Sequence, residues 1–412
     1  MYKLYGDGIH DDTAAIQSMI DSGVCEVALP APERFYLISR PLELPSNFRL
    51  VLPRFAEIRL ADHSNCVMVK NKMVPDYAKR LPECAYTKQI YQHLWSYVDD
   101  FSPDFPCENI EICGGIWNCN NENQLPNPER GMSFSVHDFY GCGMLFYNVK
   151  NFILRNLTVK DPSQYGVAMD TVSYFTVENI TFDYNLGNPY PINMDGIHLD
   201  GNCHYGVIRN LHGTCYDDFV ALNAHEGSHG PITHIQIDGL FADYCHSAVR
   251  LLLVDEIVSD IHISNIYGNY YQYVVGLTKF YPGDPKGHFD AITIDHVYAA
   301  KALPARKGDF QHPPKLERSL PYLWVQKSNV KNLTITNVHR REETIPVATI
   351  HVGEQSKVER LIVDNVTTTN TTGTPMPLLR NEGRIEYVSL RRVDPDQDDL
   401  IENRGEIERI DQ

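Results

Sequence analysis

The 412-residue sequence predicts an all-β fold: a single right-handed parallel β-helix, a solenoid in which the chain coils repeatedly around one axis, with a short N-terminal capping helix. Two observations predict this fold. From about residue 108 onward one phrase recurs, an apolar strand followed by Asn or another small polar residue and then an apolar pair. The first twenty residues instead carry apolar side chains at helical spacing.

The recurring phrase identifies the coils. Its Asn-equivalent positions are 156, 179, 210, 239 and 265, so the steps are 23, 31, 29 and 26 residues. Imperfect repeats of this length are typical of solenoids, because one coil cannot bury its own apolar side chains and a stack of coils can. The copies lie at 152–157, 175–180, 205–211, 235–240, 261–266, 333–338 and 361–366.

The Asn of each copy suits a turn at the end of a strand. Asn tolerates the left-handed backbone conformation that such turns use, and stacked Asn side chains can bond to one another. Ahead of the repeats, Ile16, Met19 and Ile20 stand at i, i+3 and i+4, which predicts one short amphipathic helix within an N-terminal cap, 1–25.

We expect one domain over 1–412. Two stretches interrupt the repeat, at about 70–107 and 281–325, and both are too long for ordinary connections, so they are predicted to be loop insertions. The first is rich in Tyr and the second in Pro, Lys and Arg. Aromatic loops suit stacking on sugars, and packing as a cover over the coils is an equal alternative.

Composition limits the partners. The formal net charge of −17 disfavours non-specific binding to nucleic acid and to anionic membranes. No stretch approaches the roughly 18 continuous apolar residues of a membrane span, and the start of the chain lacks a signal-peptide pattern, so the expected location is cytoplasmic. The ten Cys residues form no Cys-x-x-Cys pair, which disfavours a metal site. No cofactor is expected, and the oligomeric state is left open.

Three aspartates carry the predicted chemistry. Asp195 and the Asp217–Asp218 pair lie 22 residues apart, about one coil, which places them side by side at the ~4.8 Å spacing of neighbouring strands. Crowded carboxyls raise one another's pKa, so one can stay protonated as an acid while another activates water. The competing interpretation is that Asp residues cap turns in many β-helices. Asp217 and Asp218 share a site only if a turn or bulge falls between them, and the apolar run from Phe219 to Leu222 predicts that the strand starts just after the pair.

These motifs resemble glycoside hydrolase family 28, the polygalacturonase family of the pectin lyase-like superfamily, over about residues 140 to 280. The matching stretches are Asn193-Met194-Asp195-Gly196 and Asp217-Asp218-Phe219-Val220-Ala221-Leu222. The resemblance implies that Asp217 is the general acid and that Asp195 and Asp218 hold and deprotonate the attacking water. It implies that Asn193 binds substrate. It also implies inversion, with acid and base about 6.5–9.5 Å apart.

The later motifs of that family are only partly present. His246 matches the family's histidine without its flanking glycines, and Lys279 matches its lysine, whereas Leu277 replaces its arginine. Arg250 is the candidate to supply the missing charge. Loss of the arginine weakens the expectation of a galacturonate grip and favours a neutral sugar or a shorter oligosaccharide.

Two loop histidines, His225 and His229, compete with His246 for the same role. All of these residues together predict a glycoside hydrolase acting on pectin-type or related plant oligosaccharides or polysaccharides, with exo action one option. Two other functions stay open: a polysaccharide lyase or epimerase on the same fold, in which carboxylates could hold calcium, and a β-helix that binds carbohydrate without cleaving it.

Overall fold

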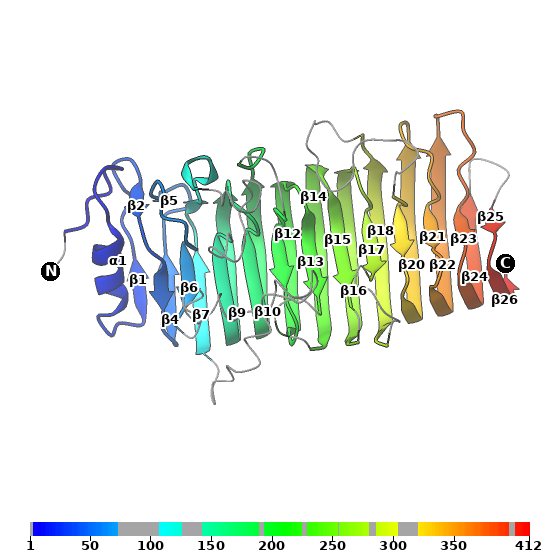
Figure 1. The fold of residues 1–412 in the computed structure, drawn as a ribbon, viewed down its shortest axis with the longest axis horizontal. Coiled ribbons are helices and arrows are strands. Elements are labelled where there is room, and N and C mark those ends of the chain that lie inside the picture. Colours follow the sequence, from blue (N-terminus) through cyan, green and yellow to red (C-terminus); the bar gives the residue numbers. More distant parts are fainter. Residues whose placement is uncertain are drawn as a thin grey trace.

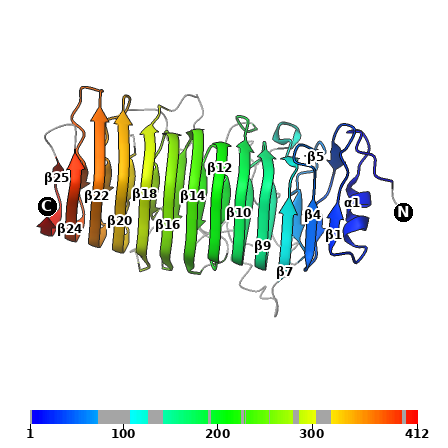
Figure 2. The same cartoon turned by 180° about the vertical axis from the view of Figure 1, so that it is seen from behind.

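The computed structural model confirms the right-handed parallel β-helix (Figures 1 and 2). It describes residues 3–72, 107–125, 142–188, 193–224, 228, 230–253, 255–279, 286–303, 320–394 and 400–412. The strands stand side by side along one long axis, and the described N-terminal and C-terminal segments lie at opposite ends of the stack. None of the described helices has the length and apolar character that crossing a bilayer requires.

The N-terminal elements are α1 (Thr13–Ile20), β1 (Glu26–Ala28), β2 (Tyr36–Ile38), β3 (Leu42–Leu44), β4 (Phe48–Val51), β5 (Glu57–Leu60), β6 (Val69–Asn71), β7 (Cys107–Cys113), β8 (Ile116–Asn118) and the 3-10 turn η3 (Asn121–Asn123). The central strands are β9 (Met144–Lys160), β10 (Val167–Asp183), β11 (Ile197–Leu199), β12 (His204–Thr214), β13 (Asp218–Asn223), β14 (Ile232–Cys245), β15 (Ser247–Leu252), β16 (Ile257–Tyr270), β17 (Val275–Thr278) and β18 (His288–Lys301). The C-terminal strands are β19 (Leu323–Val325), β20 (Asn329–Glu342), β21 (Ile350–Val352), β22 (Lys357–Asn370), β23 (Leu379–Asn381), β24 (Arg384–Asp394), β25 (Ile401–Asn403) and β26 (Glu406–Asp411).

Short and long strands alternate along the central chain and pair in two parallel ladders. The short strands pair in the order β11–β13–β15–β17–β19, and the long strands pair in the order β12–β14–β16–β18–β20. In each strand alternate apolar side chains point into the solenoid and stack on those of the next coil. The short-strand ladder carries the candidate site on its outward face.

The Asn turns behave as predicted. Asn156, Asn179 and Asn210 have φ values of 58°, 55° and 54°, in the left-handed region. The Asn179 side chain donates to Asn156 Oδ1 at 2.9 Å, and Asn210 donates to Asn179 Oδ1 at 3.2 Å. The turn therefore repeats in register from coil to coil, and this fixes the coil-to-coil alignment on which the site depends.

The predicted cap is confirmed, since α1 buries Ile16 and Ile20 against the first coil. The predicted loop at 281–325 is partly wrong, because β18 and β19 lie inside it. In β18, His296 takes the left-handed turn position, with φ of 52°, that Asn takes in other coils. The missing Asn concealed this repeat. Residues 281–285 and 304–319, like 73–106 of the other predicted loop, lie outside the described residues.

Candidate active site

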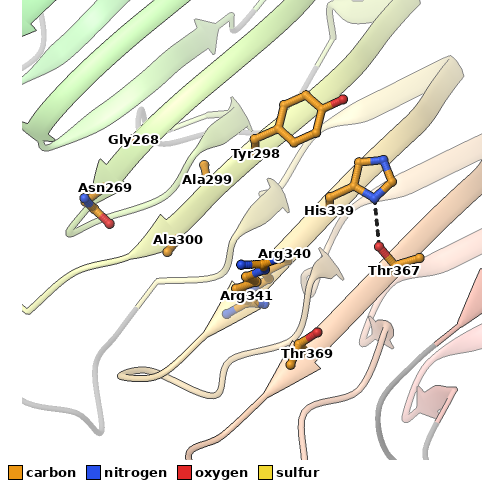
Figure 3. Close-up of a pocket in the computed structure, with 10 residues that line it drawn as sticks. All are labelled: Gly268, Asn269, Tyr298, Ala299, Ala300, His339, Arg340, Arg341, Thr367 and Thr369. Atoms are coloured by element: carbon orange, nitrogen blue, oxygen red, sulfur yellow. Dashed lines mark hydrogen bonds between the residues drawn. The ribbon is translucent and has the colours of Figure 1, made fainter.

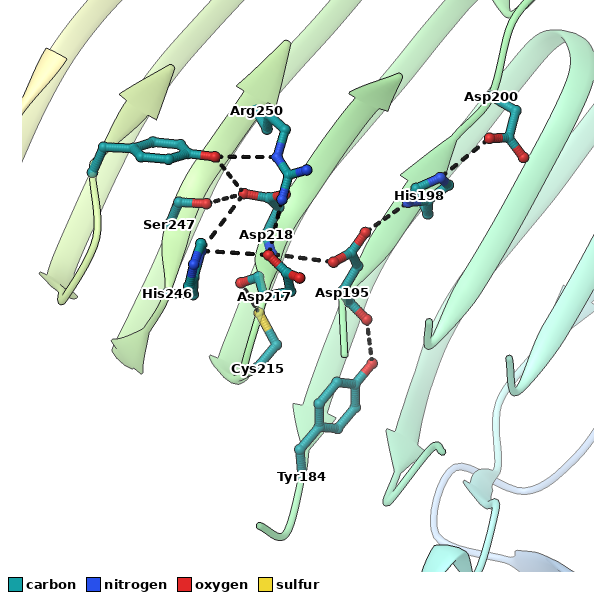
Figure 4. A network of polar contacts seen from close by, with 11 residues as sticks. Tyr184, Asp195, His198, Asp200, Cys215, Asp217, Asp218, His246, Ser247 and Arg250 are labelled. Carbon is teal, nitrogen blue, oxygen red and sulfur yellow. Dashed lines mark hydrogen bonds and ion pairs between the residues drawn. The ribbon is translucent and has the colours of Figure 1, made fainter. Parts of the chain in front are cut away.

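The three aspartates come together at the start of two neighbouring short strands (Figure 4). Asp195 lies just before β11, Asp217 just before β13, and Asp218 is the first residue of β13. The Gly196 amide donates to the Asp218 carbonyl at 2.9 Å, and the Asp218 amide donates to Asp195 Oδ1 at 3.3 Å. The one-coil spacing in the sequence thus becomes direct contact across the ladder, as predicted.

Asp217 and Asp218 share the site because the strand's alternation is broken after them. Phe219 and Val220 are consecutive, and both are buried in the core. Regular alternation begins only from Val220, which pairs with Val249. Before Val220 successive side chains need not point to opposite faces of the strand. The carboxylates of Asp217 and Asp218 therefore both contact the same guanidinium.

That guanidinium belongs to Arg250 on β15. Its Nη2 lies 3.0 Å from Asp217 Oδ1 and 2.5 Å from Asp218 Oδ2, and its Nε donates to the Tyr273 hydroxyl at 3.1 Å. The Tyr273 ring lies over Gly276, where an added Cβ would meet the ring at 2.9 Å. A side chain at position 276 would therefore displace the tyrosine that positions Arg250.

Asp218 is held from several sides. Besides Arg250, its Oδ1 accepts hydrogen bonds from the Ser247 hydroxyl and, at 3.2 Å, from Tyr273. His246, buried beside the pair, places Nδ1 3.4 Å from Asp217 Oδ1 and 3.9 Å from Asp218 Oδ1. Both oxygens of Asp218 are thus engaged by the protein, and His246 joins the site as the sequence predicted.

Asp217, Asp218 and His246 also offer one ligand atom each within 4.8 Å of one another, a spacing at which a cation can be held. Arg250 Nη2 already stands against both of these carboxylates. Positive charge at this point is therefore supplied by the chain itself.

Several residues of the site, among them His198, Asp200 and Tyr165, were not predicted from the sequence. His198 on β11 is buried and places Nδ1 2.6 Å from Asp195 Oδ2 and Nε2 3.1 Å from Asp200 Oδ1. The Tyr165 ring stacks on the His198 imidazole, with ring centroids 3.9 Å apart and 14° between the planes. The available signal was the order Asp195, His198, Asp200, which places three titratable groups within one short strand and its ends.

Burial and crowding shift the acidity of the site. Burial raises the pKa of Asp195 to about 7, the nearby charge of Asp217 adds to the rise, and the hydrogen bond from His198 opposes it. Burial likewise raises the pKa of Asp218, against the opposing charge of Arg250. Both carboxyls therefore hold protons at a higher pH than an exposed aspartate does, which is the condition that acid–base catalysis near neutral pH requires.

The expected match at Leu277 needs correction. Leu277 pairs with Leu251 and points into the core with 1% of its surface exposed. It therefore does not occupy the outward-facing position expected for the arginine. The outward positions of β17 are Gly276 and Thr278. Lys279 follows the strand and is buried, with its amide donating to Gln326 Oε1 at 3.3 Å. Its predicted contact with substrate stays a prediction.

The remaining candidates are placed as follows. Asn193 has a left-handed φ of 49° two residues before Asp195, so it shapes the turn that delivers this carboxylate. Its predicted contact with substrate stays a prediction. His225 and His229 lie outside the described residues.

A concavity lies on the outer face of the long-strand ladder (Figure 3), with a volume of about 700 Å³. Small residues such as Ala300 form its floor, and Tyr298, His339 and Arg341 stand around it. It contains none of the aspartates.

Comparison with solved structures supports the fold. The chain is similar over its whole length to 76% of a family 28 exopolygalacturonase from Yersinia enterocolitica, with a TM-score of 0.58 and 14% identity. It is similar over 98% of both chains to an endo-xylogalacturonan hydrolase from Aspergillus tubingensis (TM-score 0.55, 13% identity). Over 99% of its length it is similar to 76% of the tailspike protein of E. coli bacteriophage HK620, solved in complex with a pentasaccharide (TM-score 0.54, 12% identity).

No family description and no curated protein sequence matches the chain. At these identities the structural likeness establishes the fold, and function has to be argued from the site.

Proposed function

We propose that this protein is an inverting glycoside hydrolase whose acid and base are supplied by Asp217 and Asp195. The observation that supports the proposal best is the convergence of three buried carboxylates, two of which share the guanidinium of Arg250. Negative charge exceeds the positive charge beside it, so the cluster favours retaining a proton that can be given to a leaving oxygen.

The contacts divide the roles among the three. Asp218 has both oxygens occupied by Arg250, Ser247 and Tyr273, so it acts as an anchor that holds Arg250 in place. The oxygens that Asp217 and Asp218 offer lie within 4.8 Å, closer than the ~6.5–9.5 Å of an inverting pair. The base is therefore Asp195, whose pKa of about 7 suits a base that works near neutral pH.

The sugar at the cleavage point is proposed to be neutral. A uronate would need a cation that is available to its carboxylate, and Arg250 is already paired with Asp217 and Asp218. The outward positions of the next coil, Gly276 and Thr278, carry no charge. These features favour a neutral residue of a plant-type oligosaccharide over galacturonate.

We further propose that the enzyme acts on chain ends. Asp195 and Asp217 each expose only 2% of their surface, so the access of a substrate to the proposed catalytic carboxyls is limited. Limited access of this kind suits a terminal sugar better than the middle of a long polymer.

The test is to incubate the wild type and Asp217→Asn with a panel of neutral and pectic oligosaccharides and to follow the release of reducing ends. We expect release from a neutral substrate, and a loss of at least ~100-fold in the variant, as for removal of a general acid. An aryl glycoside of the same sugar, whose leaving group needs no proton, should be cleaved by the variant at close to the wild-type rate.

Other outcomes identify the alternatives. Unsaturated products whose formation stops with a chelator would identify a lyase. Binding that persists in Asp217→Asn, with no cleavage by the wild type of any substrate, would identify a carbohydrate-binding protein. Either result would overturn the hydrolase proposal.

A further inference from the structure

His198 has carboxylate oxygens at both of its ring nitrogens. Nδ1 lies 2.6 Å from Asp195 and Nε2 lies 3.1 Å from Asp200. A neutral imidazole carries a single N–H and can donate to only one of two ionised carboxylates, whereas the imidazolium can donate to both. The geometry therefore fits a protonated His198.

The backbone aims this side chain at the site. Ile197 and Leu199 on either side point into the core, so His198 points outward, and its cross-strand neighbour is the small Ala221. The stacked Tyr165 ring covers one face of the imidazole. Strand alternation, a small neighbour and ring stacking together restrict His198 to one orientation.

Asp200 sustains the charge on His198. Burial alone would lower the pKa of His198, but the charges and hydrogen bonds of Asp200 and Asp195 outweigh it, so the pKa stands well above its ordinary value. Asp200 has no exposed surface and lies beyond the imidazole, on the side away from Asp195 (Figure 4).

Other charged groups face the same pair. Asp217 and Asp218 precede and begin β13, Arg250 and His246 come from β15 and the residue before it, and Asp170 ends the short-strand part of β10. Burial raises the pKa of Asp170 to about 6. Acidic groups outnumber basic ones here, and His198 is the cation that touches Asp195.

We propose that His198, held by Asp200, is a positioning residue that keeps Asp195 ionised and fixed in orientation as the water-activating base. This role rests on the proposed hydrolase function, and it sets the pH range in which the enzyme works. Asp200–His198–Asp195 then forms a chain in which the outer carboxylate acts on the reaction only through the imidazole.

The first test is the pH profile of kcat/KM for His198→Gln and Asp200→Asn. His198→Gln removes the imidazolium, and Asp200→Asn makes the imidazole easier to deprotonate. Each change therefore weakens an interaction that lowers the pKa of Asp195. The acidic limb should therefore move to higher pH by about one unit or more, which cuts activity at pH 6 at least about tenfold while activity at pH 9 changes far less. The loss should lie in kcat, with KM little changed.

Asp200→Glu, which retains the charge, should restore most of the wild-type profile. His296→Asn is the matched control, because His296 makes an equally short 2.6 Å contact to Asp295 on β18, and Asn occupies this turn in other coils. An equal loss at every pH in His198→Gln, with the acidic limb in place, would show a merely structural histidine and overturn the proposal.

A second readout does not depend on hydrolysis. In ¹⁵N-histidine NMR spectra, the wild-type His198 ring should remain protonated from pH 6 to pH 9, and Asp200→Asn should make it titrate within that range. A wild-type His198 that titrates near its ordinary pKa of about 6.5 would overturn the proposal even if the enzyme proves active. A protonated His198 in a protein that cleaves nothing would instead reject only the hydrolase function.

Discussion

The carboxylate cluster of the candidate active site and the Arg340–Glu342 pair of the C-terminal coils are both buried, yet their charges are balanced differently. Arg340 Nη2 lies 2.6 Å from Glu342 Oε2, its Nη1 donates to the Val347 carbonyl at 2.8 Å, and Glu342 Oε1 accepts the Ile345 amide at 2.9 Å. One positive and one negative charge face each other, and backbone groups complete their hydrogen bonds.

In the candidate active site, Arg250 pairs with Asp217 and Asp218, His198 lies between Asp195 and Asp200, and the four carboxylates outnumber the two cations. In a buried pair of opposite charges each group neutralises the other. A buried cluster with an excess of carboxylates instead favours taking up a proton. Burial alone therefore does not mark a functional site in this fold; the excess of one sign does.

The largest expected effect comes from Asp195→Asn. The variant loses the proposed base, so kcat should fall by about 10² to 10⁴-fold. It also removes one of three crowded carboxylates, so the midpoint of thermal unfolding should stay the same or rise. Kinetics and calorimetry on one preparation check both halves, and a large drop in that midpoint would show that Asp195 serves stability.

The balanced pair should respond in the opposite way. Arg340→Ala leaves Glu342 buried without its partner, which should lower the free energy of unfolding by roughly 3–5 kcal/mol. Specific activity of the folded protein should stay unchanged. Denaturant unfolding measures the first quantity; Arg340→Met combined with Glu342→Leu, which removes both charges, should recover most of the loss.

The pH dependence of stability should separate the two clusters. The unfolded chain ionises Asp195 near pH 3.8, and the folded chain ionises it only near pH 7, so this group makes the fold less stable as pH rises between these values. The difference in unfolding midpoint between Asp195→Asn and the wild type should therefore grow from pH 4 to pH 7 and then level off. A constant difference would mean that Asp195 has an ordinary pKa.

The smallest effect is expected at Lys301, which lies near the balanced pair. Its Nζ is buried and has no hydrogen-bond partner among the described residues, and burial lowers its pKa well below the ordinary value. Lys301→Met removes an unsatisfied polar group and should stabilise the fold by roughly 1–2 kcal/mol in denaturant unfolding. Destabilisation would mean that the amine makes a contact in solution.

Much of the fold was predictable because the coil leaves a local signal. Each turn needs a residue that tolerates a left-handed backbone conformation. Asn156, Asn179 and Asn210 meet this need and can be recognised in the sequence. The β18 coil was missed because His296 fills the same turn. The proximity of Asp195 and Asp217 was also predictable, because residues one coil apart in the sequence lie next to each other on neighbouring strands.

The rest of the site depends on side-chain direction, which repeat length does not reveal. A difference of one residue along a strand turns a side chain from the outer face to the core. For this reason Leu277, which points into the core, was wrongly matched to an outward-facing position. The sequence does not distinguish His198 from other strand residues. In the structure the alternation of β11 turns its side chain outward, where it contacts Asp195. Arg250 was named as a candidate, but its pairing with two carboxylates follows only from three-dimensional distances.

The most direct test of the central claim is the anomeric configuration of the first product, followed by ¹H NMR during hydrolysis of the best substrate from the panel. Attack by a water that Asp195 activates predicts a product of inverted configuration, before mutarotation mixes the anomers. A first product of retained configuration would contradict the account, because it requires a carboxylate to attack the sugar directly.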